Sequence, residues 1–591
     1  MRSLLGELES RFRQATAKAF GQAFADRNPQ IRPAQDEQFG DYQCNAAMGL
    51  AKELNQKPRE IAQRLIDQLD VSDLCETPEI AGPGFINLRL TRDWASRTLS
   101  SILTDDRLGL AKTDQPTRVV IDYSGPNIAK EMHVGHLRST IIGDVIARVL
   151  EFLGDDVIRQ NHIGDWGTQF GMLIAHLFET VDPSRIDQGE FEIADLEAFY
   201  REAQCRYQND EAFASRARAR VVALQGGDPT ALRAWRSLRN ESIRHCQRIY
   251  DQLGVSLTLD DIRGESDYND RLPQIVSELL DDKQLAVKDQ GAVCVFLDGF
   301  KTKEGAPLPV IIQKTDGGFL YATTDLAALK FRVQELKAQR IIYVTDARQA
   351  LHFQQIFALA RRAGWDIHPQ TFQPVQLEHI TFGSVLGENG KPLKTRSGES
   401  VKLAELLDEA IERARAVVDE KNPDLSDERR RQIAHVVGIG AVKYADLSQN
   451  RTSDYIFSFE KMLAMDGNTA PYMMYAYARI KSIERRGEIE TGTLPPEARI
   501  ILAEPAELKL GKKILQFADA LDDVSTSLRP NIITAYLYDL SQAFSVFYEN
   551  CPVLKAASDE LRISRLWLCD LTARTLKLGL DLLGIKTLEQ M

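Results

Sequence analysis

Residues 118–160 read RVVIDYSGPNIAKEMHVGHLRSTIIGDVIARVLEFLGDDVIRQ, and this stretch decides the fold. Residues 118–123 form a short apolar run typical of a buried strand, and a polar loop follows them. After the loop, apolar residues recur at every fourth position, which predicts a helix that Gly154 can end: Leu137, Ile141, Val145, Val149 and Leu153. A second extended segment begins at Val157. A strand, a helix and a strand in this order are typical of a parallel sheet with a ligand crevice at its strand ends.

The same alternation returns later in the chain, after a helical and charged stretch from Thr168 to about Leu285. It resumes with a strand at 310–314 (VIIQK), a helix from Thr324, a strand at 340–346 (RIIYVTD), a helix from Gln349 and the segment VQLEHITFG. We therefore expect an α/β fold, in which a Rossmann-like parallel-sheet catalytic domain covers residues 114–465 and carries a helical insertion at about 172–285.

Two further domains flank this one. Residues 1–113 combine a helical start with the segment AGPGFINLRL at 81–90, in which a strand follows a Pro/Gly turn. An N-terminal α+β domain is expected there. From residue 466 to residue 591 the apolar residues have helical spacing only, so we expect a C-terminal all-α helical bundle.

Composition excludes several classes of protein. The chain has 73 Lys and Arg against 85 Asp and Glu, a net charge of −12, which argues against a nonspecific nucleic-acid coat protein. No stretch approaches the roughly 20 apolar residues of a membrane span, and Glu7, Glu9 and Arg11 interrupt any signal peptide. A cytoplasmic protein that binds no membrane is expected. The 7 cysteines lie far apart with no Cys-x-x-Cys pair, so we expect no zinc and no residue that binds a metal directly.

Two histidines mark the loop before the first helix as a candidate phosphate site. His133 and His136 flank Val134-Gly135 at the helix N-terminus, where free N–H groups and a partial positive charge suit phosphates. Gly135 would let a nucleotide approach the backbone, and the imidazoles can donate to phosphoryl oxygens. Taken alone, the pattern also fits a helix cap with two packed histidines. The chain has no Gly-x-x-x-x-Gly-Lys-Ser/Thr, so ATP would need a different cradle.

The residues around this loop carry a resemblance to a known family. His133-Val134-Gly135-His136 resembles the ATP-binding signature of class I aminoacyl-tRNA synthetases, and residues 123–144 resemble the arginyl-tRNA synthetases of bacteria. The resemblance continues through NHIGDWGTQFG (161–171), GESDY (264–268), residues 315–332 and 341–353, and PYMMYAYARI (471–480). It covers nearly the whole chain. It implies ATP-dependent activation of L-arginine to arginyl-adenylate and transfer to the 2′-OH of the terminal adenosine of tRNA(Arg), with release of AMP and pyrophosphate.

The predicted arginine site combines chemistry with this resemblance. A guanidinium is planar and permanently charged, and carboxylates with hydroxyl or carbonyl acceptors hold it best. Tyr321 and Asp325 are one helical turn apart, and the resemblance places both near the guanidinium, with Glu265 as a possible second carboxylate. Taken singly, Asp325 could instead cap a helix and Tyr321 could be a strand aromatic. The resemblance assigns the amino-acid backbone end to five residues: Asp122, Ser124, Asn127, His133 and Gln349.

The second class I signature, Lys-Met-Ser-Lys, is degenerate here. The corresponding loop, at 387–400, lies in GENGKPLKTRSGESVKL and keeps Lys391, Lys394 and Arg396 without Met-Ser. A plain surface hairpin would have the same pattern. We hypothesise that Lys130 supplies the missing cation, so the predicted catalytic residues are Lys130, His133, His136, Lys391 and Lys394. The predicted ATP-binding residues are Pro126, His133, Gly135, His136 and Lys394, and Mg²⁺ is expected to bind mainly through the ATP phosphates.

The remaining expectations concern tRNA and the rival functions. The resemblance implies an anticodon site on the C-terminal helices, with Tyr472, Tyr475 and Arg479, and an outer-corner contact at Phe85 and Asn87. A helix core built of Tyr and Met would also explain the tyrosines. A monomer that needs tRNA for the activation step is expected. One alternative is another class I synthetase, for glutamate, glutamine or cysteine: a carboxylate-bearing substrate would require Arg or Lys in the pocket, and cysteine would favour a thiol-rich zinc site. The other alternative is a nonenzymatic tRNA-binding relative.

Overall fold

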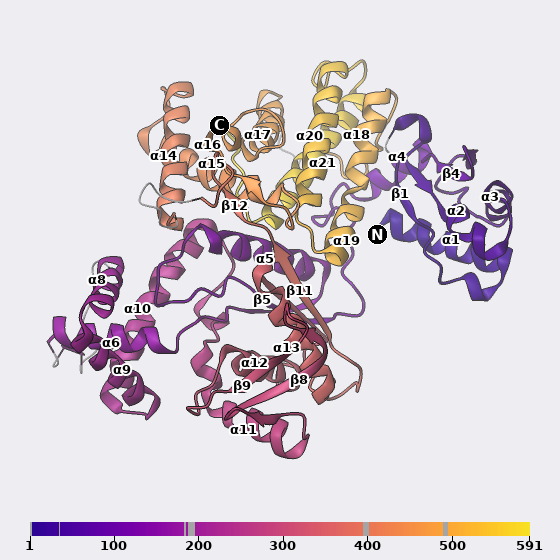
Figure 1. The fold of residues 1–591 in the computed structure, drawn as a ribbon. Helices are drawn as coiled ribbons and strands as arrows, with labels where there is room; N and C mark the ends of the chain where they lie inside the picture. The colour runs from indigo at the N-terminus through magenta and orange to yellow at the C-terminus, as the bar shows by residue number, and fades with distance from the viewer. Residues whose placement is uncertain (1–2, 35, 183–184, 187–195, 394–400, 488–493) are drawn as a thin grey trace. The chain divides into compact units, whose positions relative to one another are not determined.

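The computed structural model describes residues 3–34, 36–182, 185–186, 196–393, 401–487 and 494–591 (Figure 1). The chain divides into two compact units. One contains residues 1–112, 464–582 and 586–591, and the other, which we call the catalytic unit, contains residues 113–463 and 583–585. Lys394 and Arg396 of the predicted lysine loop lie outside the described residues.

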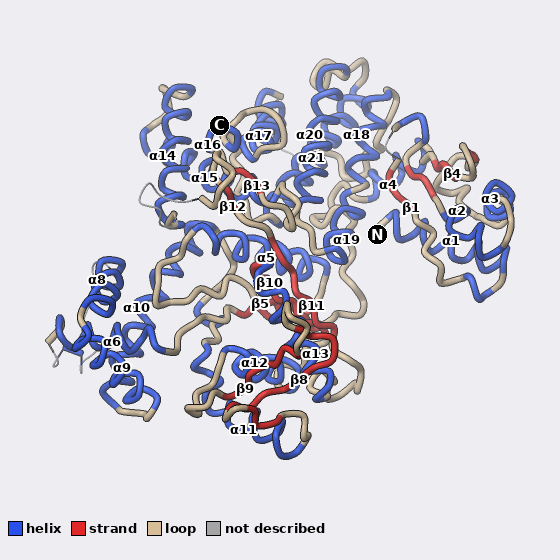
Figure 2. The backbone as a smooth tube through the Cα atoms, in the orientation of Figure 1, coloured by secondary structure: helices blue, strands red, loops and turns tan. Residues whose placement is uncertain are grey.

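A four-stranded parallel sheet forms the centre of the catalytic unit (Figure 2). Its strands are β5 (Arg118–Asp122), β6 (Asp156–Gln160), β10 (Arg340–Asp346) and β11 (Gln376–Phe382), in the order β11-β10-β5-β6. The register pairs Asp122 with Tyr343 on one side and with Gln160 on the other. The predicted Rossmann-like parallel sheet is therefore confirmed, and Asp122 ends its central strand β5.

Helices cover both faces of this sheet, as Figure 1 shows. α5 (Val134–Leu153) joins β5 to β6 and buries the predicted apolar positions Leu137, Ile141, Val145 and Val149. α12 (Tyr321–Gln334) and α13 (Ala350–Ala363) pack against the face that carries Val120, Ile341 and Leu377. Since side chains alternate between the faces of a strand, the two helix layers bury alternate residues of β5.

Two details of the predicted alternation are wrong. The segment VIIQK lies in β9 (Pro307–Gln313), which pairs antiparallel with β8 (Ala292–Lys301) and not with the parallel sheet. β8 also pairs with β7 (Val287–Asp289), which gives a separate three-stranded sheet. The short connection between β8 and β9 favours a hairpin, because a parallel pair needs a long crossover. The following helix begins at Tyr321 and not at Thr324, since Leu320 is its N-cap and accepts the first backbone bonds.

Helices make up most of the rest of the catalytic unit. α6 (Thr168–Thr180), α8 (Leu196–Asn209), α9 (Glu211–Gln225) and α10 (Pro229–Leu253) follow β6, and α11 (Leu272–Ser277) follows a 3₁₀ helix at Glu265–Arg271. After β11 come β12 (Val385–Leu386), α14 (Leu403–Lys421), α15 (Asp427–Leu447), β13 (Tyr455–Ile456) and α16 (Phe459–Met462). α10 begins at the Asp228 cap with Pro229 in its first turn and ends at Gly254, which has a positive φ of 63°.

The other unit combines an α+β part with a helical part. Its antiparallel sheet has the order β1-β2-β4-β3 and consists of β1 (Ile31–Pro33), β2 (Tyr42–Cys44), β3 (Glu79–Ala81) and β4 (Phe85–Leu88). α1 (Leu4–Phe20), α2 (Ala46–Leu54), α3 (Pro58–Ile66) and α4 (Arg92–Ser101) accompany it. The C-terminal helices are α17 (Ala470–Arg486), α18 (Pro505–Leu515), α19 (Phe517–Ser527), α20 (Asn531–Asn550) and α21 (Asp559–Leu582). No helix among the described residues has the length and apolar composition needed to cross a bilayer.

Candidate functional site

A cavity of about 430 Å³ lies at the carboxyl ends of β5 and β10, beside the N-terminus of α5. Parallel sheets offer their ligand crevice at this edge. Most of the residues predicted for ATP and arginine line this one cavity: Asp122, Ser124, Asn127, His133, Gly135, His136, Glu265, Tyr321, Asp325 and Gln349. They come from segments as distant in sequence as residues 122 and 349, so the fold itself assembles the site.

The two histidines at the start of α5 hold each other in a reciprocal cap. Nδ1 of His133 accepts the backbone N–H of Gly135 at 3.1 Å, and Nδ1 of His136 accepts the N–H of His133 at 3.1 Å. Because both Nδ1 atoms are acceptors, the Nε2 atoms carry the protons and can donate to a ligand. Burial and the neighbouring His133 lower the pKa of His136 to about 3, while burial and Lys130 lower the pKa of His133. Both rings are therefore neutral donors near pH 7.

Gly135 is required by this cap. A Cβ atom at Gly135 would lie 2.8 Å from Cε1 and 2.9 Å from Nδ1 of His133. Any side chain would displace the His133 ring from its bond to the helix backbone. The glycine thus keeps the two rings in place at the helix N-terminus, where both line the cavity. The N–H groups of Val134, Gly135 and His136 already have hydrogen-bond partners within the protein.

The loop after β5 is held in an unusual conformation at Ser124. Ser124 has a φ of +71°, a region that a residue with a side chain enters only at a cost of about 1–2 kcal/mol. Side-chain hydrogen bonds maintain it: Oγ of Ser124 bonds to the Tyr250 hydroxyl at 2.8 Å and to Thr140 Oγ1 at 2.9 Å, and its N–H donates to Ser139. Such over-determined backbone occurs mainly at functional sites. The serine is buried beneath the cavity and its hydroxyl is already bonded.

Asp122 is engaged by a buried arginine. The Nη2 atom of Arg332 donates to Oδ2 of Asp122 at 2.8 Å, and Nε of Arg332 donates to Gln160 at 2.6 Å. Burial alone would lower the pKa of Arg332, but Asp122 and nearby tyrosines raise it above its ordinary value. Asp122 therefore forms an ion pair within the sheet edge, and one of its oxygens is occupied before any ligand arrives.

A carboxylate and an aromatic ring face the far end of the cavity. Asp325 lies in the second turn of α12, one turn after Tyr321, whose side chain is 62% exposed. The Asp325 side chain is mostly buried, with 17% exposed, and Oδ2 accepts a hydrogen bond of 2.5 Å from Nε2 of His352. The ring of Tyr321 packs 4.7 Å from that of His352. Asp325 and Tyr321 both line the cavity, and both contact His352.

Glu265 adds a second carboxylate to the same cavity. Burial, with further contributions from Asp325 and Asp165, raises the pKa of Glu265 to about 7. The buried Asp165 fixes this segment, since it accepts the N–H of Ser266 at 2.9 Å and an ion pair from Arg239 at 2.6 Å. Two carboxylates that repel each other in a half-buried pocket form a natural site for a planar cation.

Three residues predicted for the ATP and catalytic sites, Pro126, Lys391 and Lys130, do not line this cavity, and a fourth, Lys394, is not described. Pro126 is buried in the loop, where its carbonyl accepts the N–H of Gly164 at 3.0 Å. Lys391 occupies a turn in which its carbonyl accepts the N–H of Gly387 at 2.8 Å. Lys394 is outside the described residues. Pro126 and Lys391 are thus not among the described residues that line the cavity.

Lys130 lines a separate hollow of about 240 Å³ together with Lys402 and His245. It remains close enough to the α5 cap for its charge to lower the pKa of His133. The segment after the predicted lysine loop adjoins the same place. Val134 donates its N–H to Val401 at 2.9 Å, and Leu403 donates to Met132 at 3.0 Å. The end of that loop is thus anchored beside the histidines.

The predicted tRNA residues all lie in the other unit. Phe85 is half-buried in β4, and Asn87, only 8% exposed, accepts a hydrogen bond from Gln43. On α17, Tyr475 is 45% exposed and Tyr472 accepts a hydrogen bond from Gln542. The guanidinium of Arg479 lies 4.4 Å from the ring centre of Tyr548. Only Tyr475 of these offers a largely free ring.

Two histidines of the site were missed in the sequence. His352 bonds to Asp325, and Nε2 of His162 lies 3.8 Å from the other carboxylate oxygen of Asp325. His162 follows directly after Asn161 in NHIGDWGTQFG, and His352 follows three residues after Gln349. Both lay in segments already singled out, but no pattern in the sequence indicated that they meet Asp325. Among the described residues, no group of three or more His, Cys, Asp or Glu side chains could hold a metal ion.

Comparisons with known proteins agree along the whole length of the chain. Residues 98–459 match the family described as class I (R) tRNA synthetases, catalytic domain, residues 6–90 match the arginyl-tRNA synthetase N-terminal domain, and residues 473–591 match the DALR anticodon binding domain. The arginine–tRNA ligase of Synechococcus elongatus is 53% identical over 598 residues, with both chains fully covered. That of Chromobacterium violaceum is 52% identical over 561 residues, covering 95% of this chain and 96% of the relative.

Solved structures give the same result. The arginyl-tRNA synthetase of Plasmodium falciparum aligns with a TM-score of 0.82 at 31% sequence identity. The arginyl-tRNA synthetase of Thermus thermophilus aligns with a TM-score of 0.82 at 26% identity. Both alignments cover 100% of each chain.

Proposed function

The chain belongs to the arginyl-tRNA synthetase family, and we propose that the cavity at the end of β5 is its site for arginine and ATP. The enzyme is an arginine–tRNA ligase of class I. It activates L-arginine with ATP to arginyl-adenylate and pyrophosphate, then transfers the arginyl group to the 2′-OH of the terminal adenosine of tRNA(Arg) and releases AMP. One observation carries the assignment of the site: the helix N-terminus with two donor histidines and the carboxylate pair Glu265 and Asp325 line one cavity.

The phosphate end of this cavity is the N-terminus of α5. In the first step the arginine carboxylate attacks the α-phosphorus of ATP, and pyrophosphate leaves. The Nε2–H groups of His133 and His136 donate to the phosphoryl oxygens as charge develops, and they do so as neutral rings that require no proton transfer. The aligned peptide dipoles of α5 add a fixed positive potential at its N-terminus. Positioning and electrostatic stabilisation supply the catalysis.

The cation end is formed by Asp325, Glu265 and Tyr321. The guanidinium lies between the two carboxylates, and the exposed Tyr321 ring covers it. Asn127 and Gln349 are exposed in the cavity wall and hold the ammonium and carboxylate groups of arginine. Ser124 acts mainly through the shape of its loop, because its hydroxyl is bonded to Tyr250. Asp122 contributes its remaining oxygen and the Arg332 ion pair that fixes it.

A lysine near the α5 cap neutralises the leaving pyrophosphate. Lys130 is exposed, and its charge already acts on His133, which supports it as the replacement for the degenerate signature. Lys391 and Lys394, from the degenerate second signature, are the other cations that we propose to act on the ATP phosphates. Mg²⁺ accompanies ATP through its phosphates and water, and it supplies further charge neutralisation there.

The other unit, which contains residues 1–112, 464–582 and 586–591, binds tRNA(Arg). Tyr475 offers an exposed ring for a stacked anticodon base, and Arg479 with Tyr472 lies on the same helix, α17. Phe85 and Asn87 contact the outer corner of the tRNA. We place the boundaries at residues 1–113, 114–465 and 466–591, and we assign the protein to the cytoplasm as a monomer.

An exchange assay tests the proposal. Arginine-dependent exchange of pyrophosphate into ATP is measured with and without tRNA(Arg), and glutamate, glutamine and cysteine serve as competing substrates. Exchange with arginine alone among these, and stronger exchange with tRNA, is the expected result. Activity with another amino acid, or no activity with arginine and tRNA(Arg), would show that the proposed function is wrong.

A further inference from the structure

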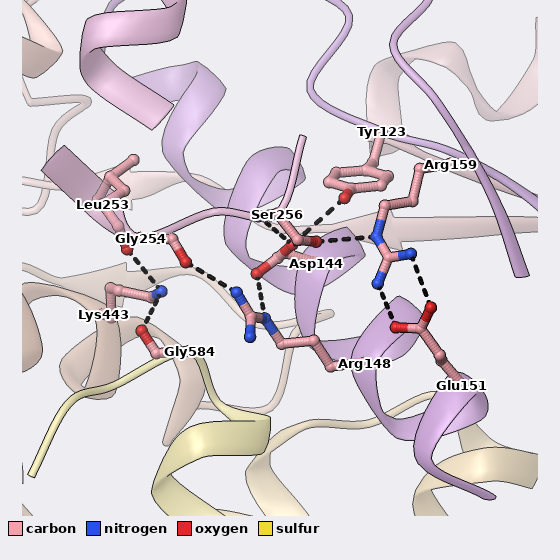
Figure 3. Close-up of polar contacts among 10 residues, drawn as sticks. All are labelled: Tyr123, Asp144, Arg148, Glu151, Arg159, Leu253, Gly254, Ser256, Lys443 and Gly584. Carbon is pink, nitrogen blue, oxygen red and sulfur yellow. Dashed lines mark hydrogen bonds and ion pairs between the residues drawn. The ribbon is translucent and has the colours of Figure 1, made fainter. Parts of the chain in front are cut away.

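A fully buried lysine lies outside the proposed site, in the cluster of polar contacts drawn in Figure 3. Nζ of Lys443, on α15, donates to the carbonyl of Leu253 at 2.8 Å and to the carbonyl of Gly584 at 2.6 Å. Removing an ammonium group from water is costly unless its surroundings compensate for it. Here two carbonyls do so, and the nearby carboxylate of Asp144 helps to keep the lysine charged. Nothing in the chemistry of the activation step uses this residue.

The first carbonyl ends a helix that reaches the arginine site. Leu253 is the last residue of α10, and Tyr250 lies one turn before it on the same helix. The Tyr250 hydroxyl bonds to Oγ of Ser124 at 2.8 Å and accepts a hydrogen bond from Asn161 at 3.0 Å. Ser124 keeps its positive φ only while such bonds hold it. The position of the α10 end therefore determines the shape of the loop that lines the cavity.

The same cluster fixes the turn after α10 and the neighbouring strand end. Nη2 of Arg148 donates to the carbonyl of Gly254 at 2.9 Å, and Oδ1 of Asp144 accepts the N–H of Ser256 at 2.8 Å (Figure 3). Oδ1 of Asp144 also accepts the Tyr123 hydroxyl at 3.3 Å. Burial alone would raise the pKa of Asp144, but Arg148 and Lys443 lower it, so the carboxylate stays ionised. Tyr123 directly precedes Ser124, so the cluster reaches the loop by two routes.

The second carbonyl belongs to a segment near the C-terminus. Leu583–Ile585 is part of the catalytic unit, although it directly continues α21 in sequence. Gly584 has a φ of +66°, and a Cβ atom there would lie 2.6 Å from Nζ of Lys443 and 3.4 Å from Oδ2 of Asp144. The flanking Leu583 and Ile585 are buried, with 0% and 2% exposed. Only glycine allows this segment to approach the lysine so closely.

We propose that Lys443 is a positioning residue for arginine binding, which fixes the end of α10 against the segment Leu583–Ile585 and thereby holds Tyr250 on Ser124. The inference rests on the proposed arginine site. If Lys443 only stabilised the fold, its substitution would lower the free energy of unfolding and leave KM for arginine unchanged. A positioning lysine is expected to affect arginine more than ATP, because the contacts end at Ser124, whereas the rings of His133 and His136 are held by their own reciprocal cap.

The test compares Lys443→Met with Tyr250→Phe, which keeps the ring and removes only the hydroxyl. KM for arginine, KM for ATP and kcat are measured by pyrophosphate exchange with saturating tRNA(Arg). Each substitution is expected to raise KM for arginine about tenfold, the effect of losing one charge-assisted or buried hydrogen bond, and to leave KM for ATP within about twofold. The double variant is expected to resemble the more affected single variant, because the two residues act in series.

Lys330→Met serves as the matched control. Lys330 is also largely buried, with 16% of its side chain exposed, and it pairs with Glu278 in the same unit. Its loss is expected to leave KM for arginine unchanged. Unchanged KM for arginine in Lys443→Met, or effects of Lys443→Met and Tyr250→Phe that multiply, would overturn the inference. If the Lys443→Met variant does not fold, Gly584→Ala takes its place in the test. The Cβ atom of the new alanine would displace the ammonium group of Lys443, and KM for arginine is then judged by the same criteria.

Failure of this inference is distinguishable from failure of the proposed function. Wild-type protein without arginine-dependent exchange would overturn both the function and the inference. Wild-type protein with exchange, together with an unaltered Lys443→Met variant, would overturn the positioning role alone.

Discussion

Nε2 of His352 lies 2.5 Å from Oδ2 of Asp325, and the two residues come from the adjacent helices α13 and α12. The bond orients the carboxylate across the contact between those helices. His162, from the loop after β6, lies 3.8 Å from the other oxygen of Asp325. A carboxylate restrained from two sides loses little rotational freedom when it binds a ligand. The proposed guanidinium pocket thus has its Asp325 carboxylate oriented by residues that the sequence did not single out.

Asp325→Asn is expected to raise KM for arginine about 30-fold or more, because removal of one partner of a buried charge pair costs at least about 2 kcal/mol. KM for ATP should change little. Pyrophosphate exchange at varied arginine concentrations measures both values. Asp316→Asn is the control, since Asp316 only accepts the N–H of Gly318 in an exposed turn. Equal KM values for arginine in both variants would exclude Asp325 from the pocket.

His352→Ala is expected to raise KM for arginine about tenfold, and His352→Gln is expected to raise it less. The alanine frees Asp325 to rotate, whereas glutamine can still donate a hydrogen bond to the carboxylate. Isothermal titration with arginine and, separately, pyrophosphate exchange check the two variants. Affinity in His352→Ala equal to that of the wild type would show that the imidazole has no positioning role.

Arginine binding is expected to weaken as the pH falls through about 7. Burial, Asp325 and Asp165 raise the pKa of Glu265 to about 7, so the free enzyme holds this carboxyl protonated below that pH and ionised above it. A bound guanidinium favours the ionised form of Glu265. Below pH 7, arginine binding must therefore release the proton from this carboxyl group. KM for arginine should rise up to about tenfold per unit as pH drops below 7.

Glu265→Gln separates this carboxyl from the other titrating groups. The amide resembles the protonated acid, so the variant should show a high KM for arginine with little dependence on pH in that range. His162 lines the pocket, His352 bonds to Asp325, and both remain in this variant. A pH dependence equal to that of the wild type in Glu265→Gln would assign the effect to these histidines instead.

The sequence predicted the parallel sheet well, because the period of four in α5 and the short apolar strands are local signals. It predicted β9 wrongly, since an apolar run such as VIIQK reads the same in a parallel sheet and in a hairpin. Tyr321, Asp325 and Glu265 were identified from residue chemistry together with the family resemblance. His162 and His352 were not, because their role depends on tertiary contacts with Asp325 that no local sequence pattern indicates. The Arg332 ion pair with Asp122 was missed for the same reason.

Lys130→Ala is expected to slow the activation step about 100-fold or more, the scale at which one group stabilising transition-state charge contributes. KM for arginine should be unchanged, because Lys130 lies outside the arginine end of the cavity. Single-turnover formation of adenylate measures this rate. Lys391→Ala provides the comparison, since Lys391 occupies the turn at the other end of the lysine loop. Intact activation in Lys130→Ala together with its loss in Lys394→Ala would show that the loop lysine is the active cation.

Arg332→Met is expected to lower the free energy of unfolding by about 3–5 kcal/mol, because it leaves the carboxylate of Asp122 buried without its partner. The Arg332 and Asp122 side chains are only 1% and 11% exposed, so water cannot replace the lost charge. Urea denaturation followed by circular dichroism measures the change. Arg118→Met is the control: Arg118 pairs with Asp156 at 43% and 49% exposure, so its loss should cost at most about 1 kcal/mol. The double variant Arg332→Met/Asp122→Leu has no unpaired buried charge, so part of the free energy of unfolding should be recovered. Its KM for arginine should be higher than that of the wild type, because the Asp122 carboxylate is absent from the cavity. Equal stability of Arg332→Met and Arg118→Met would show that the buried pair contributes no more than an exposed one.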